Sequence, residues 1–211
     1  MSFRAILFDW DGTLADTAEA TYRCYERLFR ELDIAFDRDL YARTYSPNWY
    51  DTFRALGLPE HRWTHADERW LHHFSTESVA LMNGALEVVQ HLAGAGIDVA
   101  VVTSGSRGRV TRELEMHGVA PFLRASVFGT DVEQKKPHPE ALLRCLDELG
   151  VSADDAAYVG DSPEDIMMAR AANVFAVAVP GGYPNREALL AASPDALLTT
   201  LRDVVPLSTS R

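Results

Sequence analysis

Cysteine is scarce in this chain, since Cys24 and Cys145 are its only thiols in 211 residues. Two distant cysteines provide neither a disulfide framework nor the paired spacing of a zinc site. Such scarcity is typical of proteins in a reducing compartment, so the sequence predicts a cytoplasmic location.

Basic residues are also few. Lys and Arg number 20 against 31 Asp and Glu, which gives a formal net charge of -11. Because nucleic-acid backbones are bound by clusters of positive charge, we expect no nucleic-acid partner. An acidic protein that handles phosphate must recruit positive charge locally, from a metal ion and a few basic side chains.

Long hydrophobic runs are missing as well. Asp9 interrupts the first apolar run, which leaves it too short for a signal peptide or a membrane span, so no membrane partner is expected. A hydrophobic content of 47% describes an ordinary globular protein. Its length allows one domain, or one domain with an insertion.

Two carboxylates stand where the first apolar run ends. Residues 5–8 are typical of a buried parallel strand, and Gly12 follows in a turn. Alternate side chains of an extended segment point the same way, so Asp9 and Asp11 would enter one small volume. Two anions this close require a cation between them or a proton on one. A divalent metal is one resolution, and an Asp-Gly turn facing water is the other.

Two further apolar runs end in polar turns. The run 97–102 leads into Thr103-Ser104-Gly105-Ser106, and the run 156–159 leads into Gly160-Asp161-Ser162-Pro163-Glu164-Asp165. The stretch Lys135-Lys136-Pro137-His138-Pro139 lies between them, before a helical pattern. Because ligands of parallel α/β sheets bind beyond the carboxyl ends of the strands, these motifs are expected to converge.

The rest of the pattern divides the chain. No strand alternation appears from residue 17 to 82, where helices are predicted at 17–32, 37–45, 49–56 and 64–81. After residue 83, helices alternate with apolar strands, which indicates a doubly wound parallel α/β sheet. We therefore expect a core of residues 1–16 and 83–211 with a helical insertion of residues 17–82. The tail, 206–211, is expected to fray. The core elements are predicted as a helix ending at 95, strand 97–102, helix 107–117, strand 126–128, helix 139–149, strand 156–160, helix 164–172 and strand 174–179.

These motifs resemble those of the haloacid dehalogenase superfamily of hydrolases, most of which are phosphatases. The matching segments, in order, are Asp9-Trp10-Asp11-Gly12-Thr13, Thr103, Lys136-Pro137-His138-Pro139 and Gly160-Asp161-Ser162-Pro163-Glu164-Asp165. The resemblance spans nearly the whole chain and implies a Rossmann-like core with a helical cap. It also implies a small phosphate ester as substrate, and phosphoglycolate phosphatases are the nearest named group.

The resemblance gives the carboxylates separate roles. Asp9 is expected to attack phosphorus and form an aspartyl-phosphate, while Asp11 protonates the leaving alkoxide and later takes a proton from water. Lys136 would neutralise the phosphate and Asp9, and Thr103 would offer a hydroxyl to the phosphoryl oxygens. Lys136 is preferred over Lys135 because the family pairs its lysine with a following proline.

A Mg²⁺ site is expected in the same place, because hard oxygen donors suit this ion. Asp9 and Asp161 are the expected direct ligands, and Asp11 would contribute through its backbone carbonyl. Asp165 would act on the metal through water or form a salt bridge to Lys136. The alternative is that Asp161 and Asp165 only cap the helix that follows.

Substrate contacts are expected from two loops. Ser104 and Gly105 can offer backbone N–H groups to phosphate. In the insertion, Arg43, Tyr45 and Asn48 are candidates for specificity, although a plain loop between helices accounts for the same residues. Related phosphoglycolate phosphatases usually carry glycine there, whereas this chain has Ser46-Pro47-Asn48, so the substrate is left open.

Other functions stay in view. A phosphomutase of the same superfamily would share the first half-reaction and return the phosphoryl group to a sugar. A haloacid dehalogenase is disfavoured, because members that cleave carbon–halogen bonds lack the second aspartate that Asp11 supplies. A non-catalytic protein that binds a phosphorylated ligand is the alternative from another class. The expected assembly is a monomer or a homodimer.

Overall fold

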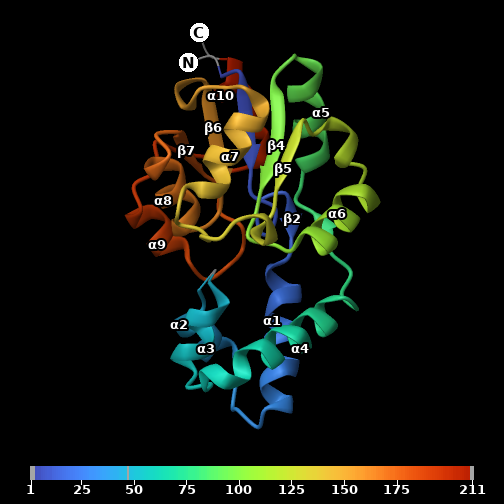
Figure 1. The fold of residues 1–211 in the computed structure, drawn as a ribbon, viewed down its shortest axis with the longest axis vertical. Coiled ribbons are helices and arrows are strands. Elements are labelled where there is room, and N and C mark those ends of the chain that lie inside the picture. The colour runs from blue at the N-terminus through green and yellow to red at the C-terminus, as the bar shows by residue number, and fades with distance from the viewer. Residues whose placement is uncertain (1–2, 47, 210–211) are drawn as a thin grey trace.

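The computed structural model describes residues 3–46 and 48–209, so Pro47 of the specificity loop, residues 1–2 of the predicted core and residues 210–211 of the tail lie outside it. A six-stranded parallel sheet forms the centre, with strand order β5-β4-β1-β6-β7-β8 (Figure 1). Its strands are β1 (Ala5–Phe8), β4 (Asp98–Val102), β5 (Ala125–Val127), β6 (Ala156–Gly160), β7 (Phe175–Ala178) and β8 (Ala196–Leu197).

Both faces of the sheet are covered by helices. In β1, Ile6 and Phe8 belong to one apolar cluster, while Ala5 and Leu7 belong to the other, as the alternation of side chains along a strand requires. This arrangement confirms the predicted doubly wound α/β fold. Helices α5 (Ala85–Gly94), α6 (Arg107–Met116) and α10 (Val204–Thr209) pack in the first cluster, and α7 (Glu140–Leu149), α8 (Pro163–Ala171) and α9 (Arg186–Ala191) in the second.

Four helices lie apart from the sheet, below it in the view of Figure 1. We call residues 17–82, which contain them, the cap segment. Its own buried cluster is rich in aromatic rings, with Tyr25 and Phe29 stacked at 5.8 Å between ring centroids. The helices are α1 (Ala18–Glu31), α2 (Arg38–Thr44), α3 (Trp49–Ala55) and α4 (Trp63–Phe74). A separate apolar cluster supports the predicted division of the chain, which stays a prediction.

The connection between the two parts differs from the prediction. Helix α4 ends at Phe74 rather than near 81, and a two-stranded antiparallel ribbon of β2 (Ala15–Asp16) and β3 (Ala80–Leu81) follows. The chain leaves the sheet through β2 and returns through β3, and pairing satisfies the backbone groups of both crossings. Segments of two residues are too short for a sequence alternation to reveal them.

The C-terminal region also differs. Neither β8 nor α9 is predicted by the apolar pattern, and residues 204–209 form α10 where fraying is expected from 206 onward. Val204 is fully buried, and the Ser208 hydroxyl donates to the backbone oxygen of Val205 at 2.7 Å, so packing holds this helix. Short 3₁₀ turns complete the fold: η1 (Glu60–Arg62), η2 (Ala120–Phe122), η3 (Gly129–Asp131), η4 (Ala153–Asp155) and η5 (Leu201–Asp203). None of the helices in the described part of the chain combines the length and apolar content needed to cross a bilayer.

Candidate active site

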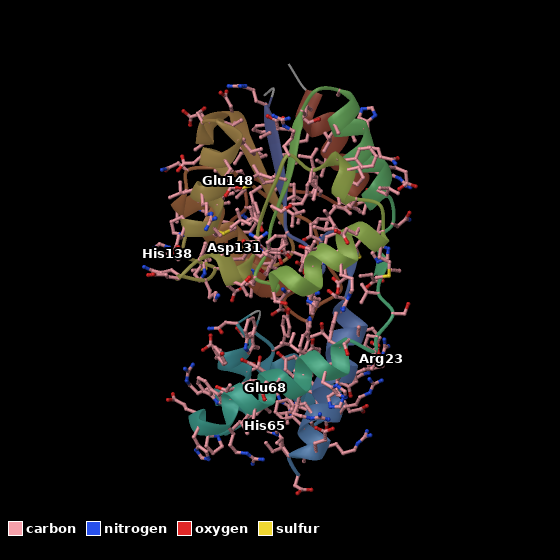
Figure 2. The ribbon with its side chains drawn as sticks, turned by 45° about the vertical axis from the view of Figure 1, so that its right-hand side comes forward. Arg23, His65, Glu68, Asp131, His138 and Glu148 are labelled. Carbon is pink, nitrogen blue, oxygen red and sulfur yellow. The ribbon has the colours of Figure 1, made fainter. Side chains whose placement is uncertain are left out.

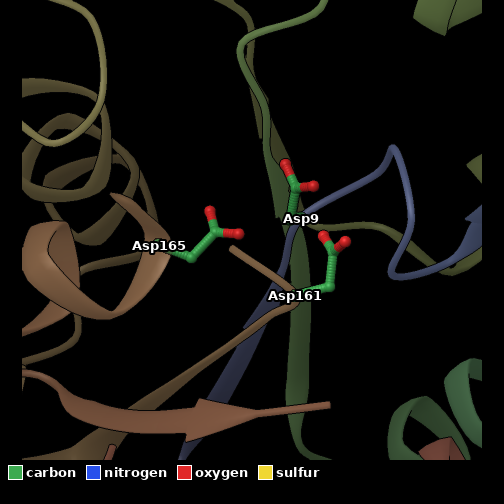
Figure 3. Close-up of side chains that lie close together, drawn as sticks. All are labelled: Asp9, Asp161 and Asp165. Carbon is green, nitrogen blue, oxygen red and sulfur yellow. The ribbon is translucent and has the colours of Figure 1, made fainter. Parts of the chain in front are cut away.

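Three buried polar side chains stand at the ends of neighbouring strands. Asp9, Thr103 and Asp161 directly follow β1, β4 and β6, which lie side by side in the sheet. The structure thus brings together residues that are far apart in sequence. Asp165, in the first turn of α8, joins them, and one oxygen each of Asp9, Asp161 and Asp165 lies within 4.8 Å of the others (Figure 3).

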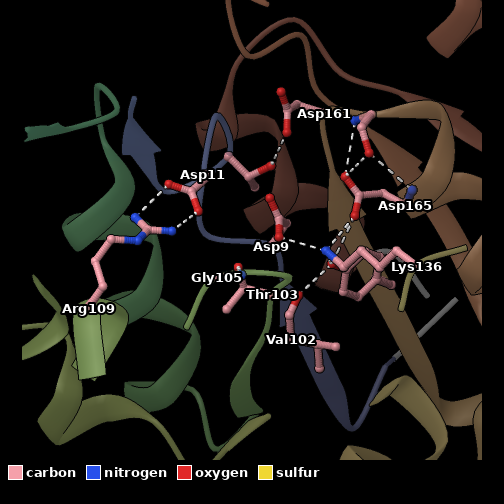
Figure 4. A network of polar contacts seen from close by, with 12 residues as sticks. Asp9, Asp11, Val102, Thr103, Gly105, Arg109, Lys136, Asp161 and Asp165 are labelled. Atoms are coloured by element: carbon pink, nitrogen blue, oxygen red, sulfur yellow. Dashed lines mark hydrogen bonds and ion pairs between the residues drawn. The ribbon is translucent and has the colours of Figure 1, made fainter. Parts of the chain in front are cut away.

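Lys136 is the cation of this cluster. Its Nζ lies 2.7 Å from an oxygen of Asp9, 2.7 Å from an oxygen of Asp165 and 2.7 Å from the hydroxyl of Tyr158 (Figure 4). Asp165 also accepts bonds from the backbone N–H and hydroxyl of Ser162, at 3.1 and 2.8 Å. The structure therefore shows the salt bridge from Asp165 to Lys136, which is one of the roles expected from the sequence. A role of Asp165 in metal binding stays a prediction.

Negative charge exceeds positive charge in the cluster. Burial raises the pKa of Asp9 to about 7; Lys136 lowers it, and the nearby Asp165 and Asp11 raise it. Burial also raises the pKa of Asp161, and Asp165 and Asp9 add to that shift. Three carboxylates and one lysine in a low-dielectric space carry an excess of negative charge, which favours the binding of a further positive charge.

The residues present fit a divalent cation. Asp9 and Asp161 offer carboxylate oxygens, the donors that Mg²⁺ prefers. Asp161 is held by the Thr13 hydroxyl, which donates to it at 3.2 Å. Gly12 adopts a φ of 83°, and a Cβ at that position would lie 2.4 Å from an Asp161 oxygen, so only glycine permits this approach. The expected contribution of the Asp11 backbone carbonyl stays a prediction.

Asp11 is held by an arginine. The Arg109 guanidinium, on α6, donates to both carboxylate oxygens, with Nη1 2.9 Å from Oδ1 and Nη2 close to Oδ2 (Figure 4). Arg109 also donates to Glu113 at 3.0 Å, and Glu113 accepts from the Trp10 indole at 2.6 Å. On its other side the guanidinium lies 4.9 Å from the ring centre of Phe74, the last residue of α4. Asp11 thus lines the cavity and is linked to Phe74 of the cap segment through Arg109.

The turn after β4 connects the sheet to α6 and lines the site. The Gly105 N–H donates to the Thr103 hydroxyl oxygen at 3.0 Å, and the loop leads into the start of α6. A Cβ on Gly105 would lie 2.5 Å from the Arg109 guanidinium and 2.6 Å from Val110, so a larger residue here would displace these side chains. Thr103, Ser104 and Gly105 all line the same cavity as Asp9 and Lys136.

That cavity lies between the sheet edge and the cap segment and has a volume of about 380 Å³. Of the three cap residues expected to contact substrate, Tyr45 lines it and stacks on Tyr183 with 4.9 Å between ring centroids. Arg43 and Asn48 do not line it, and Asn48 instead caps α3 and bonds to Asp51.

The chain matches one family model over most of its length. Residues 6–179 match the model described as haloacid dehalogenase-like hydrolase. The chain belongs to this family. The predicted resemblance is therefore confirmed.

Two relatives of this haloacid dehalogenase-like hydrolase are named pyrophosphatase and phosphoglycolate phosphatase. The chain is 30% identical to pyrophosphatase PpaX of Bacillus cereus, with 98% of this chain and 97% of the relative covered. It is 29% identical to phosphoglycolate phosphatase of Yersinia pseudotuberculosis, with 97% and 93% covered. CbbY of Rhodobacter sphaeroides, solved in complex with phosphate, is 25% identical with a TM-score of 0.80 and 96% of each chain covered. A haloacid dehalogenase-like family hydrolase of Streptococcus pneumoniae shares the fold at 18% identity, with a TM-score of 0.84 and 97% and 98% covered.

Several residues around the site are not found from the sequence pattern. Arg109 and Glu113 lie four residues apart on α6 and read as an exposed ion pair, although their side chains are only 9% and 5% exposed. Tyr158 falls within an apolar strand, and its hydroxyl bonds to Lys136. Tyr183 follows the last long strand and bonds to the Thr17 hydroxyl at 2.9 Å. Only the position of Arg109 just after the Thr103 loop could have indicated its role.

Replacement of Arg109 is expected to destabilise the fold. Arg109→Met leaves two carboxylates without their cation, which typically costs about 3 kcal/mol or more for a buried pair. Arg112→Met, on the same helix but exposed, should cost less than about 0.5 kcal/mol. Denaturant unfolding of the two variants measures the difference, and equal midpoints would show that the Arg109 pairing contributes no stability.

Proposed function

We propose that this chain is a Mg²⁺-dependent phosphatase that hydrolyses a small phosphorylated metabolite through an aspartyl-phosphate on Asp9. The observation that carries the proposal is the surroundings of Asp9: Lys136 bonds to one of its oxygens, Asp161 lies beside it and Asp11 opens on the same cavity. Relatives named phosphoglycolate phosphatase and pyrophosphatase support phosphoryl transfer, as does a neighbour that holds phosphate.

The first step forms a bond between an Asp9 oxygen and phosphorus. The bond from phosphorus to the leaving oxygen breaks, and that oxygen keeps the electron pair and takes a proton from Asp11. In the second step Asp11 takes a proton from water, whose oxygen attacks phosphorus. The Asp9–phosphorus bond then breaks, which regenerates the carboxylate and releases inorganic phosphate.

Positive charge and N–H donors stabilise the phosphoryl oxygens in both steps. Lys136 is fixed by three partners, and the loop from Thr103 to Gly105 lines the same cavity. Mg²⁺ held by Asp9 and Asp161 would neutralise charge on the phosphoryl group.

Arg109 constrains the proton transfer. Both oxygens of Asp11 accept bonds from this arginine, so both are engaged in the ion pair. To carry a proton, Asp11 must release at least one of these bonds. Because Arg109 also touches Phe74, closure of the cap segment over substrate is a natural occasion for that release. The division into core and cap belongs to this proposal, as do a cytoplasmic location and a monomeric or homodimeric state.

Phosphate release with metal present tests the reaction class. A panel of phosphate esters with Mg²⁺ should yield inorganic phosphate in step with the freed alcohol, and EDTA should abolish turnover. A mutase would interconvert isomers with little phosphate release, and a dehalogenase would release halide without metal. If no ester is turned over, the protein is a binding protein and the proposal is wrong.

Two substitutions separate the roles of the aspartates. Asp9→Asn should abolish turnover and formation of the phosphoenzyme, because the amide is a poor nucleophile. Asp11→Asn should still bind metal but lose about 10²-fold or more of the rate, which is the usual scale of general acid–base catalysis. Rapid quench with a ³²P-labelled ester measures both, and near-normal turnover by Asp9→Asn would refute the covalent mechanism.

Metal binding should depend on pH. With a pKa of about 7 in the metal-free site, Asp9 is increasingly protonated below pH 7, and a proton there competes with Mg²⁺. The affinity for Mg²⁺, followed by the rise in melting temperature, should therefore fall from pH 8 to pH 6 by up to about tenfold per pH unit below the pKa. Asp9→Asn lacks the titrating group and should show a flatter dependence, whereas equal slopes would assign the pH effect elsewhere.

A further inference from the structure

The cap side of the cavity is lined mainly by aromatic rings. Tyr25 comes from α1, the stacked pair Tyr45 and Tyr183 closes one end, and α3 and α4 supply the rest. Trp49 and Tyr50 lie 5.4 Å apart between ring centroids, and Tyr25 and Trp70 lie 6.1 Å apart. The rings of the cap segment that line the cavity are Tyr25, Tyr45, Trp49, Tyr50, Phe53 and Trp70.

Positive charge is confined to the opposite side. Among the described residues, the cations that line the cavity are Arg109, Lys135 and Lys136, none of which belongs to the cap segment. Each is already engaged: Arg109 by Asp11, Lys136 by Asp9, and Lys135 by the backbone oxygen of Gly129. Several arginines of the cap segment are paired away from the cavity, for example Arg69 with Glu31 at 2.8 Å.

Among the described residues of the cap segment, Asp67 is the one ionisable side chain, tyrosines aside, that lines the cavity. Its carboxylate accepts a hydrogen bond from the Tyr50 hydroxyl at 2.8 Å, and burial raises its pKa. A second acidic group on the substrate would therefore meet a carboxylate and apolar rings, where an anion loses its hydration without gaining a partner. Small acidic esters such as phosphoglycolate are disfavoured, and so is pyrophosphate.

One observation favours an uncharged ring over an organic cation. Asp67 is already bonded to Tyr50, which weakens it as a partner for a cation. The cavity volume of about 380 Å³ falls in the roughly 300–1,000 Å³ range of small-molecule pockets, which provides space for a ring beside the phosphoryl group.

We propose that the substrate is a phosphate monoester whose alcohol carries an uncharged aromatic ring, and that this ring lies against α3 and α4 of the cap segment. This inference rests on the proposed phosphatase function and assigns the leaving group of that reaction. The core side of the cavity binds the phosphoryl group, and the cap side selects the alcohol by stacking and exclusion of charge.

Four phosphate compounds, compared in the same phosphate-release assay, test this assignment. The kcat/KM for phosphate release with Mg²⁺ is measured for benzyl phosphate, phosphoglycolate, choline phosphate and pyrophosphate. Benzyl phosphate and phosphoglycolate both release the oxygen of a primary alcohol from phosphorus, and they differ in that one alcohol carries a ring and the other a carboxylate. We expect benzyl phosphate to exceed each of the other three by at least about tenfold, on the scale of pocket discrimination between substrates.

The outcomes separate the inference from the function on which it rests. Faster hydrolysis of phosphoglycolate or pyrophosphate would overturn the aromatic assignment and leave the phosphatase intact. Preference for choline phosphate would overturn the uncharged ring. Release of phosphate from no ester at all would overturn the phosphatase itself, and the inference with it.

Substitutions on the cap segment provide a second test. Trp49→Arg adds a cation to the cavity lining and should shift the ratio of kcat/KM for phosphoglycolate over benzyl phosphate upward by about tenfold or more, while Trp49→Phe should keep the ratio. Asp67→Asn removes one negative charge and should raise the same ratio. Glu68→Gln is its matched control, since Glu68 is exposed on α4 and does not line the cavity (Figure 2). Equal ratios in Asp67→Asn and Glu68→Gln, with no gain in Trp49→Arg, would refute the assignment.

Discussion

The buried ammonium of Lys136 is the charge around which the carboxylates of the site are arranged. Its side chain is 8% exposed, and it bonds to Asp9 and Asp165, which are buried as well. Burying any one of these charges alone would cost several kcal/mol, so each depends on the others. The compensation is incomplete, because the pKa of Asp9 is still raised to about 7 and the pKa of Asp161 is raised as well. An acidic site whose negative charge is not fully balanced favours the binding of a further cation. For this reason the site fits a divalent metal.

The sheet supplies the geometry that this charge arrangement requires. Strands β4, β1 and β6 are adjacent and parallel, so Thr103, Asp9 and Asp161 leave them at one edge. Helices pack on both faces of these strands, and the fully buried β1 therefore holds Asp9 on a rigid element. Lys136 arrives from a connection rather than from a strand, and Tyr158 and Asp165 fix its position.

The parts of the structure that depend on local pattern could be predicted from the sequence. Apolar runs that end in polar turns located Asp9, Thr103 and Asp161, and the alternation of strands and helices predicted the doubly wound sheet. Features that depend on tertiary contacts could not be read in this way. The ribbon of β2 and β3 has only two residues in each strand, and α10 is held by packing against α5. The burial of Arg109 is invisible in the spacing of its helix, as is the clustering of rings from three helices around one cavity.

The two sides of the cavity differ in their residues, and Arg109 contacts both. The core side carries the cations and most of the carboxylates, whereas the cap side presents rings and little charge. In the proposed mechanism, Asp11 transfers the proton to the leaving oxygen. Its partner Arg109 contacts Phe74 at 4.9 Å, and Phe74 stacks on Trp70 of the cavity wall with 4.9 Å between centroids. Trp70 is therefore two contacts from the arginine that restrains the acid. In the proposed mechanism, a leaving group that rests against Trp70 can affect the release of Asp11 through these side chains, so the identity of the alcohol affects the chemical step as well as binding.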